Sequence, residues 1–153
     1  MIRPVALPPP PWLLALVALS FVLPGLLGHD PWKGYDAIGI EIVHQMRLTG
    51  DWLVPRIAGE PWLEDPPFYH WFALAFATAT GWALPFHEAV RLASGTCVLV
   101  ACTFLYWAAR GMAREDERQT AGAAAVLLLI GSVGLIVHAH EAIPDHAALA
   151  SAA

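Results

Sequence analysis

The sequence predicts an all-α integral membrane protein, and three observations lead to this fold class. Of its 153 residues, 58% are hydrophobic and only 14% are charged, whereas soluble domains usually carry about 25% charged residues. The apolar residues cluster in three uncharged runs, at 11–28, 92–109 and 119–137, each about long enough to cross a bilayer as a helix. Polar residues collect between the runs. We therefore expect three spans and, from about residue 144, the start of a fourth.

The first run, PWLLALVALSFVLPGLLG, is either a retained span or the apolar part of a signal peptide. Arg3 precedes it, as a basic residue precedes the apolar part of a signal peptide. No good small-residue cleavage site follows it. The sequence therefore favours a retained first span.

Positive charges predict how the spans are oriented. The segment RGMAREDER at 110–118 holds the densest cluster of arginines, and such clusters stay on the cytoplasmic side. Arg3 should share that side, which requires an even number of crossings between the two. The runs at 11–28 and 92–109 supply two crossings. The apolar segment 67–85 is therefore predicted to be a helix in the outer interface, packed on protein, rather than a span.

This orientation places most of the polar chemistry on one face of the membrane, in an outer loop at 29–88 and near residues 138–146. Ten of the thirteen acidic residues fall on that face. So do all seven histidines: His29, His44, His70, His87, His138, His140 and His146. The net charge of −5 gives no electrostatic support for a nucleic-acid partner.

Within the outer loop, residues 36–48 are predicted to form a short surface helix. Their apolar residues fall mainly on one arc, and Thr49-Gly50 supplies a stop signal. Asp36 stands at the start, where aspartate is well suited to cap a helix over 37–48. A carboxylate there could alternatively act as a general base.

The next segment carries the most specific motif of the chain. It reads TGDWLVPRIAGEPWLEDPPFYHW, with Gly50-Asp51-Trp52-Leu53-Val54-Pro55 followed by Gly59, Pro61, Glu64, Pro66 and Pro67. Proline pre-sets the backbone of such a loop, and tryptophan anchors it at the membrane interface. We therefore expect an ordered loop held against the outer leaflet.

This motif resembles the first outer loop of a family of GT-C membrane glycosyltransferases, which includes the lipid A aminoarabinose transferases and the protein O-mannosyltransferases. The resemblance covers about residues 30–150 and implies that residues 1–153 are the N-terminal part of a GT-C domain. It further implies inverting transfer of a sugar from a polyprenyl-phosphate donor to a lipid, glycan or protein hydroxyl. The expected location is the outer, periplasmic face of a bacterial inner membrane.

Two acids are candidates for catalysis. The resemblance implies that Asp36 takes the proton of the acceptor hydroxyl, with Asp30 on the same loop as the next candidate. The family usually has an Asp-Glu pair at this place, whereas this chain has Tyr35-Asp36. Asp36 therefore matches either the Glu or, with a shift of one residue, the Asp.

Four further residues are expected at the substrate. The resemblance implies that Glu64 contacts substrate or metal, although a solvated loop acid is the simpler alternative. Asp65 stands where the family has a lysine thought to meet the lipid phosphate. Arg91 could meet that phosphate or only anchor the second span. Asp145 corresponds to an outer-face acid near the fourth span, where the helix dipole would also favour it.

A divalent metal (Zn, Mn or Mg) is a further expectation. Histidine and carboxylate ligands suit such ions, and the segment at 138–146 gathers them densely. The candidate ligands are Glu64, His138, His140 and Glu141. Polar residues at a membrane exit are the alternative interpretation, since no known metal-binding signature is present.

A different class of function stays open at this stage. The chain could be a small non-enzymatic membrane protein, either an assembly subunit or a metal-binding subunit. If the transferase interpretation holds, residues 1–153 alone should be inactive, because further spans are needed to enclose the donor lipid.

Overall fold

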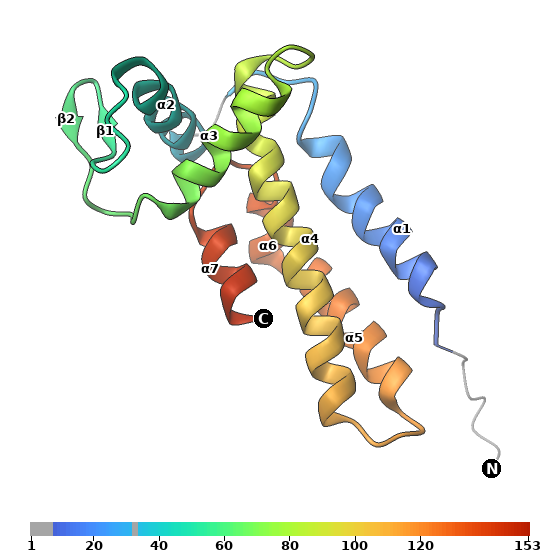
Figure 1. Ribbon diagram of the computed structural model, residues 1–153. Helices are drawn as coiled ribbons and strands as arrows, with labels where there is room; N and C mark the ends of the chain where they lie inside the picture. The colour runs from blue at the N-terminus through green and yellow to red at the C-terminus, as the bar shows by residue number, and fades with distance from the viewer. Residues whose placement is uncertain (1–7, 32–33) are drawn as a thin grey trace.

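The computed structural model describes residues 8–31 and 34–153, and these are mostly helical, which confirms the predicted all-α class. Arg3, used above to orient the first span, lies outside the described residues. The elements in chain order are α1 (Pro11–Val22), the 3-10 helix η1 (Leu23–Gly25), α2 (Gly34–Thr49), β1 (Arg56–Ile57), β2 (Glu60–Pro61), α3 (Phe68–Thr80), α4 (Phe86–Met112), α5 (Arg118–Ile130), α6 (Val133–His138) and α7 (Asp145–Ala152) (Figure 1).

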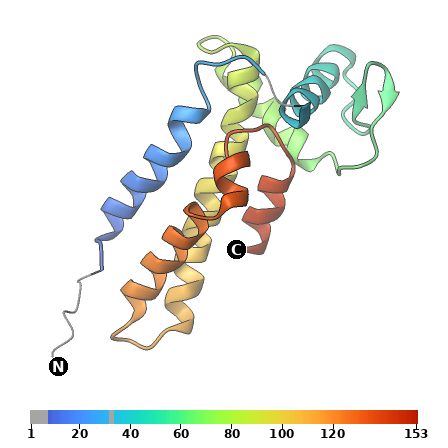
Figure 2. The ribbon, with the colours of Figure 1, turned by 180° about the vertical axis from the view of Figure 1, so that it is seen from behind.

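Helix α4 is the axis of the molecule. It packs against α1, α3, α5 and α7, and the views from front and back show these helices arranged around it (Figures 1 and 2). At 27 residues, α4 is the one helix in the described part of the chain that is long and apolar enough to cross a membrane. Pro11–Gly25 and Arg118–Ile130 are apolar but shorter.

The helix boundaries differ from the predicted spans. The run at 11–28 is helical only to Val22 and then tightens into η1, which contains Pro24. The second predicted span corresponds to α4. This helix begins at Phe86, directly after Pro85 and six residues before the predicted start at residue 92. The run at 119–137 is divided between α5 and α6, because Gly131 ends α5 and Ser132 is extended. Three continuous spans therefore stay a prediction.

A helix at 36–48 is confirmed, although its start differs from the expectation, and its place on the membrane surface stays a prediction. Helix α2 begins at Gly34, so Asp36 lies in its first turn and is not its N-cap. The helix ends at Thr49, and Gly50 adopts a φ of +70°, a conformation that glycine adopts without strain. The predicted stop signal is therefore correct.

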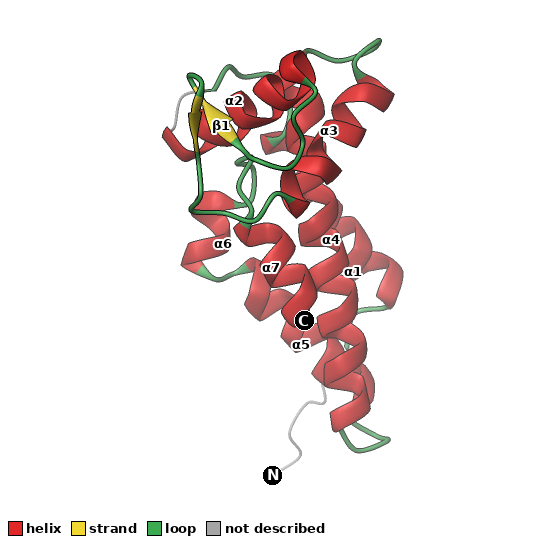
Figure 3. Cartoon of the chain, turned by 60° about the vertical axis from the view of Figure 1, so that its left-hand side comes forward, coloured by secondary structure: helices red, strands yellow, loops and turns green. Residues whose placement is uncertain are grey.

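The outer-loop elements and the arginine-rich turn lie at opposite ends of the molecule. Helices α2 and α3 and the two-residue strands gather around the start of α4, whereas the turn between α4 and α5 lies at the far end (Figure 3). Strand β1 pairs antiparallel with β2, with Arg56 opposite Pro61. This separation matches a membrane orientation with the two sets of residues on opposite faces.

The orientation can be tested with single cysteines at Glu60 and Asp116, in a background where Cys97 and Cys102 are replaced by alanine. In intact cells, a membrane-impermeant thiol reagent should label position 60. Position 116 should react only after the membrane is permeabilised. Labelling of position 116 from outside would contradict the orientation and make 67–85 a crossing segment.

Two buried clusters hold the helices together. One joins α2, α3 and α4 around Ile42, Tyr69 and Val90. Its polar contact is the hydrogen bond between the Tyr69 hydroxyl and Ser94 Oγ, 2.6 Å long. Burial raises the pKa of Tyr69 well above its usual range, so this hydroxyl stays protonated. The other cluster runs along α1, α4, α5 and α6 and includes Val22 and Val98.

Helix α2 also meets the segment before α7 at a glycine. A Cβ added at Gly39 would collide with the backbone carbonyl oxygen of Ala142. No bulkier residue fits there unless the two backbones move apart. Gly39 thus lets the segment around Ala142 pack directly on α2.

Gly39→Ala is expected to reduce the free energy of unfolding by about 1–3 kcal/mol, because the segment around Ala142 must shift. Gly34→Ala is the matched control in the same helix, since a Cβ there meets nothing within 4 Å. It should be neutral or slightly stabilising. Thermal unfolding of both variants measures the difference, and equal melting temperatures would contradict the close contact.

Candidate functional site

A pocket of about 330 Å³ lies between the motif loop, α2 and the start of α7. Its ionisable lining residues are Tyr35, Glu64, Asp65, His70, His138 and Asp145. Trp62 and several apolar residues complete the wall. The pocket therefore brings the predicted residues Glu64, Asp65, His138 and Asp145 to one place, although they are up to 81 positions apart in the chain.

The motif residues order the loop that forms one wall of the pocket. Asp51 accepts hydrogen bonds from the backbone N–H groups of Leu53 (3.3 Å) and Val54 (3.4 Å). The hydrogen bond from Val54 lowers the pKa of Asp51 most, and the bond from Leu53 and the nearby Arg56 lower it further. Asp51 therefore stays ionised as it accepts these bonds. The loop is ordered as expected, and its contact with the outer leaflet stays a prediction.

Tryptophans fix the rest of the loop through their indole N–H groups. Trp71 donates to the carbonyl of Trp52 at 2.6 Å, which ties α3 to the start of the motif. Trp62 donates to Asp65 Oδ2 at 3.1 Å, and its backbone N–H donates to Pro55 at 2.7 Å. Asp65 is therefore held at the pocket wall as a half-buried hydrogen-bond acceptor.

The charge of the pocket is negative. Of its acidic lining residues, Glu64 and Asp145 are exposed and Asp65 is half-buried. Among the described residues, no lysine or arginine lines it. The three carboxylates of the described lining disfavour an anionic group and favour a neutral or cationic one.

His70 lies in the first turn of α3 and is fully buried. Burial lowers its pKa to about 4, although Asp65 acts in the opposite direction. The imidazole is therefore neutral at physiological pH. Neither of its ring nitrogens has a hydrogen-bond partner among the described residues.

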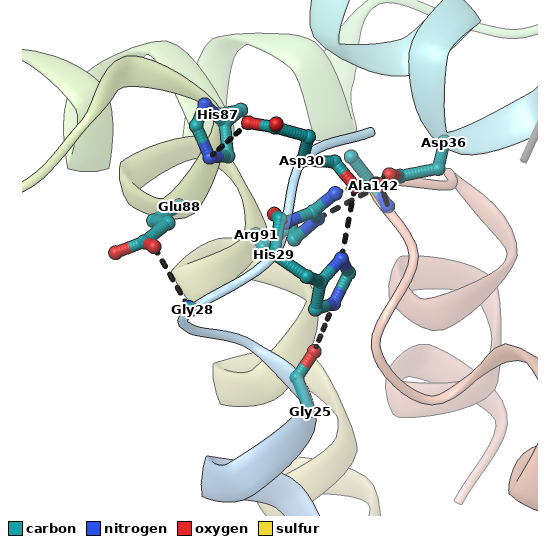
Figure 4. A network of polar contacts seen from close by, with 9 residues as sticks. All are labelled: Gly25, Gly28, His29, Asp30, Asp36, His87, Glu88, Arg91 and Ala142. Carbon is teal, nitrogen blue, oxygen red and sulfur yellow. Dashed lines mark hydrogen bonds and ion pairs between the residues drawn. The ribbon is translucent and has the colours of Figure 1, made fainter. Parts of the chain in front are cut away.

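Asp36 and Arg91 form a buried ion pair away from the pocket lining (Figure 4). Arg91 Nε donates to Asp36 Oδ1 at 3.1 Å, and Nη2 donates to Oδ2 at 2.6 Å. Arg91 Nη1 donates to the carbonyl of His29 at 2.8 Å, and the N–H of Ala142 donates to Asp36 Oδ1 at 2.9 Å. The pair therefore connects α2, α4, the loop after η1 and the segment before α7.

These contacts bear on two predicted roles. Asp36 is 2% exposed and Arg91 is 0% exposed, and each nitrogen of the guanidinium donates a hydrogen bond. The neighbouring residue, Tyr35, is the one that lines the pocket. Proton abstraction by Asp36 and phosphate binding by Arg91 stay predictions, and the geometry favours a positioning role for both residues.

Asp30, the second predicted catalytic acid, is not in the pocket lining. Its side chain is 98% exposed and lies 4.0 Å from His87 Nε2 (Figure 4). Nearby, Glu88 accepts a hydrogen bond from the N–H of Gly28 at 2.8 Å. These contacts tie the loop after η1 to the start of α4.

The four predicted metal ligands do not come together. His138 Nδ1 lies 3.1 Å from Glu141 Oε2, and Glu64 shares the pocket with His138. His140 is turned toward α1, where its Nε2 donates to the carbonyl of Phe21 at 2.9 Å. Within residues 8–31 and 34–153, no group of three or more histidine, cysteine or acidic residues is arranged to hold an ion.

Sequence reasoning missed two pocket residues. Tyr35 directly precedes the predicted acid Asp36, and one step along a helix turns a side chain by about 100°. For His70 the sequence favours an interfacial or structural residue over a ligand. Its signal was a lone imidazole near the end of the motif, where the apolar helix α3 begins, which is also typical of a structural histidine.

No protein-family model and no solved structure matches the chain. Two curated proteins are similar to it. One is the undecaprenyl phosphate-alpha-4-amino-4-deoxy-L-arabinose arabinosyl transferase of Yersinia enterocolitica, 32% identical over 127 residues. The other is the transferase 2 of the same description from Sodalis glossinidius, 28% identical over 125 residues.

These matches cover 78% and 80% of the chain, respectively, but only 22% of each relative. The chain thus spans about a fifth of the length of the curated relatives that it matches. The predicted resemblance to the family of aminoarabinose transferases is confirmed.

Proposed function

We propose that the full-length protein is a membrane glycosyltransferase that moves a sugar from a polyprenyl-phosphate donor to the hydroxyl of an outer-face acceptor. The observation that carries this proposal is the pocket, because the motif loop and Asp145 meet there. The similarity to two transferases named for an undecaprenyl phosphate sugar supports the donor class.

The reaction breaks one bond and forms one. The bond between the anomeric carbon and the phosphate oxygen breaks, and polyprenyl phosphate leaves with the electron pair. A bond forms between that carbon and the acceptor oxygen, on the opposite face of the sugar. The acceptor proton passes to a carboxylate. No oxidant or reductant is needed, so the protein contributes positioning, a base and electrostatic stabilisation.

We assign the base to Asp145. It is exposed to the pocket in the first turn of α7, opposite the motif loop. A base must come within hydrogen-bond reach of the proton that it removes, and an accessible carboxylate meets this condition better than the buried Asp36. Glu64, on the opposite wall, would hold the sugar or the acceptor.

The lipid phosphate belongs outside this pocket. Asp65 replaces the lysine expected from the family, and the three pocket carboxylates would repel a phosphate. The donor would therefore place its sugar among Glu64, Asp65 and Asp145 and keep its phosphate outside this lining.

The membrane arrangement is part of the proposal. The GT-C fold would use α4 as a full span, with α1 and the α5–α6 segment as further crossings and α7 as the start of a fourth. The arginine-rich turn would face the cytoplasm and the pocket the periplasm. Residues 1–153 would form the N-terminal part of the transferase domain.

A divalent metal is not used in this mechanism. His140 contacts α1 rather than the pocket, and the described ligands do not surround one point. The residues as placed therefore do not fit the predicted metal site. The metal stays a prediction that elemental analysis of the purified protein can test.

A transfer assay tests the function. The purified full-length protein in lipid nanodiscs is given a panel of undecaprenyl-phosphate sugars together with lipid A, and the product is identified by mass spectrometry. Acceptor-dependent formation of a glycosylated product with release of undecaprenyl phosphate is expected. Should no sugar be transferred to lipid A, the panel is repeated with protein and glycan acceptors, and failure with all of them would refute the proposal.

A further inference from the structure

His70 is a buried polar group whose hydrogen-bonding capacity is unused. It is 0% exposed, and neither ring nitrogen has a partner among the described residues. Buried side-chain polar atoms in folded proteins nearly always have at least one partner. An imidazole left without one is destabilising, so its presence at a pocket points to a ligand.

The position of His70 connects it to the pocket. It follows the motif loop by one helical turn and is part of the pocket lining together with Glu64, Asp65 and Asp145. Its ring packs edge-on against Tyr69, with ring centroids 5.5 Å apart. The Tyr69 hydroxyl is hydrogen-bonded to Ser94, so the imidazole packs against a ring whose position is fixed.

The chemistry of the surroundings indicates the ligand. A neutral imidazole offers one donor and one acceptor, and a sugar hydroxyl can pair with either. The aromatic rings of Tyr35 and Trp62 supply apolar surface in the same pocket. The three carboxylates accept hydrogen bonds from further hydroxyl or amino groups and repel acidic ones.

We propose that His70 is a positioning residue that hydrogen-bonds a hydroxyl of a non-anionic sugar ring in this pocket. The inference rests on the proposed glycosyl transfer and narrows its substrate class to neutral or amino sugars. Sugars with a carboxylate, such as uronic acids, are disfavoured by the three carboxylates of the described lining.

A purely structural histidine would behave differently on substitution. His70→Phe keeps the ring and its packing but removes both nitrogens. Relieving an unpaired buried polar group should raise the melting temperature by about 2–4 °C. If His70 served only the fold, sugar binding would be unchanged. A gain in stability together with a loss of binding is specific to a positioning role.

The experiment uses the full-length protein in nanodiscs with three monosaccharide probes of one ring size: glucose, glucosamine and glucuronate. Binding is followed by NMR of ¹⁵N-labelled histidine side chains. Glucose and glucosamine should shift the His70 resonances, and glucuronate should bind about tenfold more weakly or not at all. His70→Phe should weaken glucosamine binding by about 3- to 10-fold.

Three variants complete the test. His70→Asn or His70→Gln, whose amide can replace one ring nitrogen, should restore part of the binding. His44→Phe is the matched control, because His44 does not line the pocket. It should leave sugar binding unchanged.

The outcomes separate this inference from the proposed function. Unshifted His70 resonances with all three sugars, equal binding of glucuronate, or normal binding by His70→Phe would overturn the inference. Sugar transfer could still be measured in that case, and the function would stand. Conversely, sugar binding through His70 without transfer by the protein would refute the transferase and leave a sugar-binding site.

Discussion

Replacing Asp145 with asparagine should slow sugar transfer by about 10²- to 10⁴-fold, the usual contribution of a general base. The substitution keeps the size of the side chain but removes its ability to take the acceptor proton. Asp145 is exposed at the start of α7, so the fold does not depend on its charge. The turnover number of the full-length protein measures the loss, and thermal unfolding should show a nearly unchanged melting temperature.

Asp116→Asn is the control for this experiment, since it removes an aspartate from the turn at the opposite end of the molecule. Its turnover should equal that of the parent protein. Nearly normal turnover in Asp145→Asn would show that Asp145 is not the base. A loss confined to Glu64→Gln would then transfer the role to the carboxylate on the opposite wall.

The second large effect is expected on stability, from Arg91→Ala. Removing one partner of a buried ion pair leaves the other charge without compensation, which typically costs about 3–5 kcal/mol. Here Asp36 would be left 2% exposed, with the N–H of Ala142 as its remaining described donor. The carbonyl of His29 would also lose its hydrogen bond. Chemical denaturation of the purified protein measures the change.

Two controls show whether the lost stability comes from the buried ion pair. Arg114 is 84% exposed and 3.9 Å from Asp116, so Arg114→Ala should cost less than about 1 kcal/mol. Asp36→Leu combined with Arg91→Met removes both charges together and should recover most of the lost stability. If Arg91→Ala cost no more than Arg114→Ala, the buried pair would not hold these segments together.

Asp36→Asn distinguishes the positioning role from the catalytic role predicted from the sequence. We expect reduced stability, because Arg91 loses its charged partner, while folded protein keeps more than about a tenth of its turnover. A loss of about 10²-fold or more in turnover at unchanged stability would instead restore Asp36 as the base.

The sequence predicts local features of this fold well. The amphipathic pattern and the Thr49-Gly50 signal locate α2, and the apolar segment after Pro66-Pro67 locates α3. The start of α4 is not predicted, because the uncharged run begins only at residue 92, whereas the helix begins at Phe86 and includes Arg91. The charge of Arg91 is tolerated in this apolar region because it pairs with Asp36, which lies 55 positions away in the chain. No local pattern reveals such a partner.

In the candidate site, too, the sequence predicts which residues matter better than it predicts their distant contacts. Glu64, Asp65 and Asp145 were chosen from the motif and the family resemblance, and the structure brings them into one pocket. The family resemblance also implies the catalytic role of Asp36, but a resemblance in sequence does not show that the side chain turns inward to Arg91. Likewise, His140 was grouped with His138 by proximity in the chain, but it contacts Phe21 on another helix.

The central claim is that the sugar binds between the motif loop and the start of α7. Photoaffinity labelling tests it most directly, with an undecaprenyl-phosphate aminosugar that carries a diazirine on its sugar ring. After irradiation of the full-length protein and proteolysis, we predict adducts on residues 62–65 and 143–145, which excess unlabelled donor should suppress. Adducts confined to other segments, such as the turn between α4 and α5, would contradict the account.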